Sequence, residues 1–150
     1  MPENIYITPL LLRLIASGDW KQPTDKQIET IAPFFNGEPL DFLTTVESIK
    51  RTSRLTFDTE RKVDTMFREY IGSLCLLPKQ LPWRDVEQSL LIAVCRNPGD
   101  DIAIALDYRT SQTNPRVIGS NWTPHTSRIT WQVITPTFTE FLEKLDISYK

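Results

Sequence analysis

The sequence predicts an α+β fold, in which helices pack on one face of a mostly antiparallel sheet of about four to six strands. Three observations predict it. Helix start and stop signals recur through residues 1–89, apolar residues alternate with a period of two through much of 90–135, and an amphipathic stripe closes the chain. Because 150 residues is the size of one domain, we expect 1–150 to be a single domain with a helical front (1–89) and a back (90–150) formed by the sheet and the terminal helix.

Two helices are predicted near the start of the chain. Thr8 and Pro9 occupy the N-cap and first helical positions of one helix, which Gly18 ends. Thr24 begins a second helix, with a glutamine three residues later to complete a capping box. Pro33 falls inside the apolar pattern that follows, so this second helix is expected to be short or kinked.

The rest of the front half holds two further predicted helices and a linker. Thr44, with Glu47 three residues later, marks one possible start. Asp58 is the predicted N-cap of the other, which Gly72 ends. Residues 74–83 contain two prolines and indicate a linker or short edge structure. The helix after Asp58 carries an apolar stripe, predicted to be core, formed by Val63, Met66, Phe67 and Tyr70.

The back half predicts a meander followed by a helix. Residues 90–95 form an apolar run, 97–100 have turn chemistry, and 102–108 alternate, which together indicate a β-hairpin. Residues 116–122 and 129–133 are the next two predicted strands. The last helix starts at either Thr135-Pro136 or Thr137 and buries a stripe formed by Phe138, Phe141, Leu142 and Leu145.

Composition excludes several classes of function. The net charge of −2 disfavours nucleic acid as a direct partner, since phosphate binding needs a basic surface. One histidine and two cysteines cannot assemble the common zinc sites, and five dispersed glycines cannot form a phosphate-binding loop. We therefore expect no metal and no cofactor.

The sequence shows neither a secretory signal nor an apolar stretch of about 18 residues that could cross a membrane. Two cysteines do not form a disulfide framework. We expect a cytoplasmic protein without membrane contact.

The order of features from Leu90 to Asp146 resembles the SUKH superfamily, which includes a fungal cell-wall-synthesis regulator and many bacterial immunity proteins. The resemblance rests on the apolar strand, Gly99-Asp100, Leu106-Asp107, a later strand with Val117, and the terminal Phe-x-x-Phe-Leu helix. It implies an α+β fold and a protein-binding role, with no shared catalytic residues. It also implies a protein partner, such as the nuclease domain of a toxin.

Acidic residues around the predicted hairpin are the first candidate site. Asp100, Asp101 and Asp107, with the neighbouring Arg109, would form an acidic surface beside small residues that suits a basic partner. Asp is also favoured in turns, because its side chain bonds the local backbone. Turn capping and a solvated strand end are therefore the alternative interpretation.

Aromatic residues near a proline turn are the second candidate. Trp122 and His125 are placed where exposed aromatics bind partners, whereas Trp131 alternates with apolar neighbours and is predicted to be core. His125 could in principle pair with Cys75 or Cys95 as base and nucleophile. Catalytic cysteines need an electropositive, accessible setting, which neither cysteine has in this sequence.

The remaining cluster is basic and consists of Lys50, Arg51 and Arg54, a pattern typical of a solvated helix face. Taken together, the sequence favours a non-enzymatic protein-binding module, most concretely an immunity protein that neutralises a bacterial toxin. A regulatory or scaffold protein of the same fold is the alternative, followed by a small hydrolase that uses the acidic residues or His125.

Overall fold

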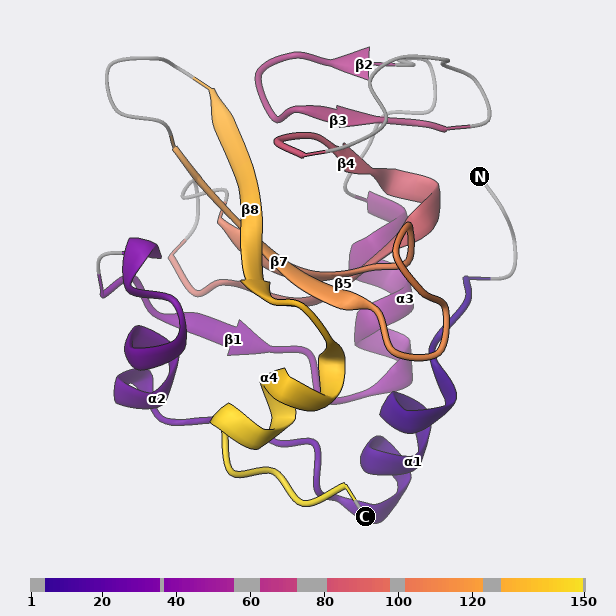
Figure 1. Cartoon of the computed structure of the whole chain (residues 1–150), viewed down its shortest axis with the longest axis vertical. Helices are drawn as coiled ribbons and strands as arrows, with labels where there is room; N and C mark the ends of the chain where they lie inside the picture. Colours follow the sequence, from indigo (N-terminus) through magenta and orange to yellow (C-terminus); the bar gives the residue numbers. More distant parts are fainter. Residues whose placement is uncertain are drawn as a thin grey trace.

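The computed structural model describes residues 5–35, 37–55, 63–72, 81–97, 102–122 and 128–149. Its centre is a five-stranded sheet in the order β1-β5-β6-β7-β8, and every neighbouring pair is antiparallel. The predicted α+β class is therefore confirmed, as is the terminal helix (Figure 1). The strands of this sheet are β1 (Leu40–Phe42), β5 (Ser89–Cys95), β6 (Ala103–Asp107), β7 (Arg116–Trp122) and β8 (Ile129–Thr135).

The described helices are α1 (Pro9–Ser17), α2 (Asp25–Ile31), α3 (Val46–Leu55) and α4 (Phe138–Lys144), with 3₁₀ turns η1 (Pro33–Phe35) and η2 (Val86–Gln88). A second, three-stranded sheet is formed by β2 (Val63–Asp64), β3 (Glu69–Tyr70) and β4 (Arg84–Asp85), in the order β2-β3-β4. None of the helices in the described ranges combines the length and hydropathy that crossing a bilayer requires.

Helix boundaries follow the predicted caps closely. The Thr24 hydroxyl accepts from the Gln27 amide at 3.1 Å, and the Gln27 side chain accepts from the Thr24 amide at 2.9 Å, which completes the capping box of α2. Gly18 ends α1 with φ at +83°, a left-handed conformation that glycine adopts without strain. At α4, the hydroxyl of Thr137 accepts from the Glu140 amide, so the later of the two predicted starts is the observed one.

The start of α3 differs from the prediction by one residue. The hydroxyl of Thr45, not Thr44, accepts from the Ser48 amide at 3.1 Å, and the helix begins at Val46. Both threonines can cap a helix, so the sequence does not distinguish two adjacent capping residues.

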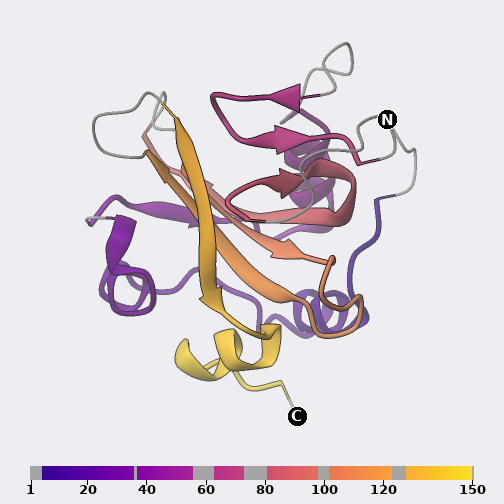
Figure 2. The same cartoon turned by 45° about the horizontal axis from the view of Figure 1, so that its top comes forward.

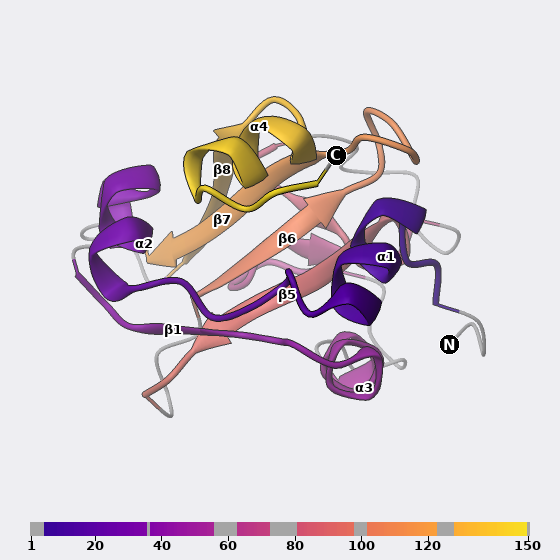
Figure 3. The same cartoon turned by 90° about the horizontal axis from the view of Figure 1, so that it is seen from below.

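One face of the central sheet is covered by α1, α2 and α4 (Figure 3). The strands contribute Leu90, Ile92, Ile104, Leu106 and Val117 to this face, all fully buried. The helices cover them with apolar residues at helical spacing, so the interface is an ordinary hydrophobic core. Its helical members include Leu11, Leu14, Ile28, Phe138, Phe141 and Leu142.

The opposite face is covered by the small sheet, which Figure 2 shows above the central one. Residues 63–72, predicted to be helical, instead form an antiparallel β2-β3 hairpin, so that prediction is wrong. Met66, which the predicted stripe would bury, is 47% exposed at the turn. Tertiary pairing favours the extended conformation of this segment over the predicted helix, because β3 pairs in parallel with β4, which is distant in sequence.

The β1 edge of the central sheet is closed by a side chain. The Gln22 side-chain oxygen accepts from the Phe42 amide at 2.7 Å, and its nitrogen donates to the Leu40 carbonyl at 2.8 Å. The amide of Gln22 thus takes the place of a neighbouring strand's backbone. Edge groups capped in this way are not available to another chain.

Candidate binding surface and the polar network beside it

β8 is the other edge strand of the central sheet, and the small sheet covers only its first half. The Ile129 amide donates to the Met66 carbonyl at 2.7 Å, and the Trp131 amide donates to the Pro82 carbonyl at 3.1 Å. The Trp131 indole also donates to the Phe67 carbonyl at 3.0 Å. The β2-β3 turn and the residues before β4 therefore occupy this part of the edge (Figure 1).

Among the described residues, nothing pairs with the second half of the β8 edge at Val133. The backbone N–H groups of successive residues in a strand point to opposite sides. Because the amides of Ile129 and Trp131 point outward, the amide of Val133 points outward as well. No group in the described ranges accepts from that amide, and Val133 is 43% exposed. The register irregularity of the β7-β8 pair lies beyond Val133, so it does not alter this alternation. An extended chain could add here as a sixth strand.

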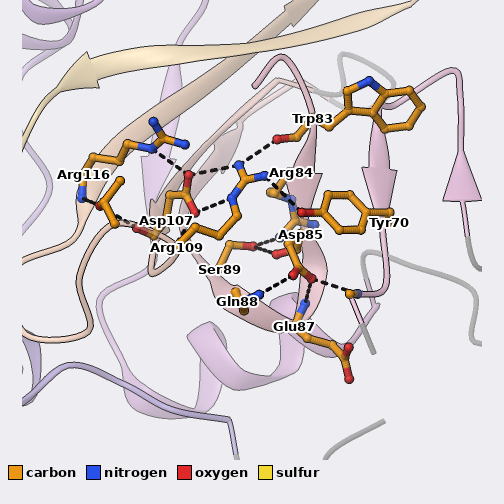
Figure 4. Close-up of polar contacts among 12 residues, drawn as sticks. Tyr70, Trp83, Arg84, Asp85, Glu87, Gln88, Ser89, Asp107, Arg109 and Arg116 are labelled. Atoms are coloured by element: carbon orange, nitrogen blue, oxygen red, sulfur yellow. Dashed lines mark hydrogen bonds and ion pairs between the residues drawn. The ribbon is translucent and has the colours of Figure 1, made fainter. Parts of the chain in front are cut away.

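A buried carboxylate lies at the end of β6, two strands inward from β8. It is on the face of the central sheet that also carries the Val133 side chain. Asp107 is fully buried, and two arginines bind it (Figure 4). One oxygen accepts from Nε of Arg109 at 2.8 Å, and the other accepts from Nε of Arg116 at 2.8 Å and from Arg109 Nη2 at 3.0 Å. Both oxygens of the carboxylate are thus held inside the protein.

Arg109 connects this carboxylate to the small sheet. Its Nη2 donates to the Trp83 carbonyl at 2.7 Å, and its Nη1 donates to the Tyr70 hydroxyl at 3.3 Å. The side chain of Arg109 is only 9% exposed. The guanidinium therefore holds β6 against the segments that carry β3 and β4.

A second buried ion pair lies within the small sheet. Nε of Arg84 donates to a Glu69 carboxylate oxygen at 2.7 Å, its Nη2 contacts the same oxygen, and its Nη1 donates to the Ser89 hydroxyl at 2.7 Å. The side chains of Arg84 and Glu69 are 1% and 8% exposed. The Arg84 guanidinium lies 5.2 Å from the ring centre of Trp131, so it also stacks on β8.

Asp85 organises the turn from β4 into β5. Its carboxylate accepts from the amides of Gly72 and Glu87 at 3.1 and 3.0 Å and from the Gln88 side chain at 2.7 Å. A Cβ at Gly72 would lie 2.3 Å from an Asp85 carboxylate oxygen, so this close approach requires glycine.

Burial and charge act in opposite directions on these groups. Burial raises the pKa of Asp107, but the hydrogen bonds and charges of Arg109 and Arg116 outweigh it and hold the pKa below its usual value. Burial also raises the pKa of Tyr70, although the hydrogen bond from Arg109 opposes this shift. Asp107 is therefore an ionised, structural carboxylate at neutral pH.

The predicted acidic surface is wrong for the two residues that the structure describes. Asp107 is fully buried and pairs with Arg109, whose side chain is only 9% exposed, because a strand-end carboxylate beneath the small sheet needs internal partners. Asp100, Asp101 and His125 lie outside the described residues.

Trp122 is half-buried, with its ring 6.0 Å from that of Phe67, whereas Trp131 is buried as predicted. Cys75 lies outside the described ranges, and Cys95 is partly buried against the helix-side core. In the basic cluster, Lys50 is half-buried and Arg51 is exposed on α3, and the Arg54 side chain lies outside the description.

Sequence reasoning missed Glu69, Arg84 and Asp85. Glu69 was assigned to a helix, and Arg84 and Asp85 follow a proline-rich segment without a motif. The sequence shows only that these residues are charged and that Arg84 and Asp85 precede a strand. That information does not reveal a buried partner.

Three comparisons were made, with protein-family models, with curated proteins and with solved structures, and none found a match for this chain. Within the described ranges, no group of three or more histidine, cysteine, aspartate or glutamate side chains could hold a metal ion.

Proposed function

We propose that this chain is a non-enzymatic protein-binding module, and specifically an immunity protein that binds and neutralises a bacterial toxin in the cytoplasm. The observation that carries the proposal is the open stretch of β8 around Val133, in a sheet whose other edge is capped by Gln22. The resemblance of residues 90–146 to the SUKH superfamily supplies the expected class of partner.

The open stretch supports protein binding because exposed strand edges are normally covered or blunted. Here the small sheet covers the first half of β8 and leaves Val133 with an outward amide and an exposed side chain. Such an edge offers backbone hydrogen bonds to an incoming strand and a side chain for it to contact.

The geometry of Asp107 counts against its use as a hydrolytic base. A general base must reach a substrate or a water molecule, whereas both Asp107 oxygens are occupied by arginine side chains and the residue is fully buried. Asp107 could act as a base only if it gave up these contacts. The interpretation of this carboxylate as a hydrolytic residue therefore loses support.

Co-expression with the products of the genes that flank this one tests the proposal, because an immunity protein is expected to be encoded beside its toxin. We expect the chain to restore growth of the host and to co-elute with the toxic domain as a stable complex. A catalytically inactive toxin is the control, since it should bind equally without affecting growth. A toxic neighbour that is neither bound nor neutralised would contradict the proposal. A bound partner without toxicity would instead assign the chain a regulatory or scaffold role.

A further inference from the structure

Arg116 has a guanidinium that is anchored on its Nε side and, within the described part of the chain, has no partner on its other side. Its Nε donates to Asp107 at 2.8 Å, and Figure 4 shows this contact at the Nε side of the guanidinium. Among the residues that the structure describes, neither terminal nitrogen has a partner, and the side chain is 20% exposed. Asp107 thus fixes the orientation of Arg116 and leaves its bidentate edge for another anion.

The side chains around Asp107 carry more positive than negative charge, which also favours binding of an anion. One carboxylate is shared by two guanidinium groups, Arg109 and Arg116, so the three side chains carry a net positive charge. Arg96 provides a contrast on the surface, since it lies within salt-bridge distance of two carboxylates, Asp41 and Asp25. The excess positive charge is accessible at Arg116, because Arg109 uses its nitrogens internally.

Arg116 lies on the same face as the open part of the β8 edge. Asp107 pairs with Arg116 across β6 and β7, and Ile118 pairs with Val133 across β7 and β8. Residues two apart on a strand share a face, so Arg116, Ile118 and Val133 point the same way. A strand added to β8 would lie about 10 Å from β7, which is two strand spacings, and Arg116 lies two residues, about 7 Å, along β7 from the Ile118–Val133 pair. The added segment must therefore continue beyond Val133 and past the end of β8 at Thr135 to bring a long acidic side chain opposite Arg116.

We propose that Arg116 is the carboxylate-binding residue of a strand-addition site. An extended segment of the partner pairs with β8 at Val133, continues past Thr135 and places a glutamate side chain on the terminal nitrogens of Arg116. The inference rests on the proposed protein-binding function and adds the chemistry of the contacting segment, which is acidic at this point. Charge complementarity with the unbalanced arginines favours such a segment over a basic or neutral one.

Peptide titrations of the intact chain test this inference without the natural partner. The probes are three blocked eight-residue peptides of alternating valine and threonine that differ only at one central residue, which is glutamate, glutamine or lysine. We expect the glutamate peptide to bind about fivefold more tightly than the glutamine peptide, the gain of a partly exposed ion pair. The lysine peptide should bind most weakly. Chemical-shift changes should appear at the Val133 amide and at Arg116 Nε.

Two protein variants separate the edge from the charge. Arg116→Gln should make the glutamate and glutamine peptides bind equally, whereas Arg51→Gln, at an exposed arginine on α3, should preserve the difference. Val133→Pro removes an outward amide, which proline tolerates on edge strands, and should weaken all three peptides at least tenfold. If Arg116→Gln does not fold, the comparison of peptides on the unmodified chain still decides the question.

The outcomes distinguish this inference from the proposed function. Equal affinity for the three peptides, or shifts confined to residues away from Val133 and Arg116, would overturn the strand-addition site. A toxin complex that is unaffected by both Val133→Pro and Arg116→Gln would also overturn it, while the immunity function would stand. Glutamate-selective binding without any toxin complex would support the site and count against the immunity function.

Discussion

The two faces of the central sheet are stabilised by different means. The face under α1, α2 and α4 is apolar, with aromatic contacts such as Trp20 to Phe42 at 5.2 Å and Phe42 to Phe141 at 6.2 Å between ring centres. The face under the small sheet contains a smaller apolar cluster and two buried ionic groups, centred on Asp107 and Arg84. The first face depends on total apolar area, and the second depends on particular partners.

This difference changes how each face should respond to substitution. Apolar burial is nondirectional and tolerates replacement by residues of similar volume. A buried ion pair contributes little net stability, but removing one partner leaves an uncompensated charge at a cost of several kcal/mol. Truncation should therefore be most harmful on the helix side, and charge removal on the side of the small sheet.

Phe141→Ala should give the largest effect. Phe141 is fully buried between the sheet and α4, and phenylalanine-to-alanine changes in cores cost about 3–5 kcal/mol. We expect a loss of about 4 kcal/mol in the free energy of unfolding, measured by urea denaturation. Thr139→Ala, on the same helix but only partly buried, is the control and should cost much less. Equal losses in the two variants would contradict the apolar description of this face.

Glu69→Gln should be next, with a loss of about 3 kcal/mol, because it leaves Arg84 buried without its carboxylate. The double variant Glu69→Leu with Arg84→Met should lose less than Glu69→Gln, since it removes both charges and keeps apolar volume. Urea denaturation of both variants measures the comparison. A double variant that is less stable than Glu69→Gln would show that the polar groups themselves stabilise this face.

The sequence predicted the helix side well because its signals are local. Capping residues, glycines at helix ends and the alternation of apolar and polar residues predict α1, α2, α4 and the meander from β5 to β8 without knowledge of distant contacts. The small sheet could not be predicted in this way. Two-residue strands have no measurable period, and the parallel pairing of β3 with β4 joins residues about 15 positions apart.

The candidate site was predicted less well than the fold. The sequence located Asp107 at the end of a strand, but a carboxylate there is compatible with either solvent or an internal partner. Arg116, 9 positions later in the chain, becomes its partner only through the β6-β7 register. The open edge at Val133 also depends on which strand is outermost, which alternation alone does not reveal.

Asp107→Asn tests the ionic side through pH. The pKa of Asp107 is lowered in the folded protein, so its ionisation stabilises the fold above the usual aspartate pKa of about 4 and this contribution is lost as pH falls through the folded value. At pH 7 we expect Asp107→Asn to cost about 2 kcal/mol, the value of charge-assisted hydrogen bonds. The melting temperature, measured from pH 7 to pH 2, should fall less steeply with decreasing pH in the variant. Asp19→Asn, exposed near α1, is the control and should keep the original slope. Parallel pH profiles for Asp107→Asn and the unmodified chain would show that the network does not depend on this charge.

The smallest effect should come from the capped edge on the helix side. Gln22→Ala removes both side-chain hydrogen bonds to β1, but Gln22 is exposed and water can replace them, so we expect a loss of about 1 kcal/mol. The more informative result is association, because uncapped edge strands pair with other chains. Sedimentation at increasing concentration should show Gln22→Ala self-associating more than the adjacent exposed variant Lys21→Ala. Gln22→Glu retains the acceptor for the Phe42 amide but lacks the donor to Leu40, and its self-association should fall between those of the other two variants.

If all three variants remain equally monomeric, the cap is a local hydrogen-bonding feature, and an uncapped edge is then not sufficient for association in this sheet. The open stretch at Val133 would in that case need the charge of Arg116 to attract a strand.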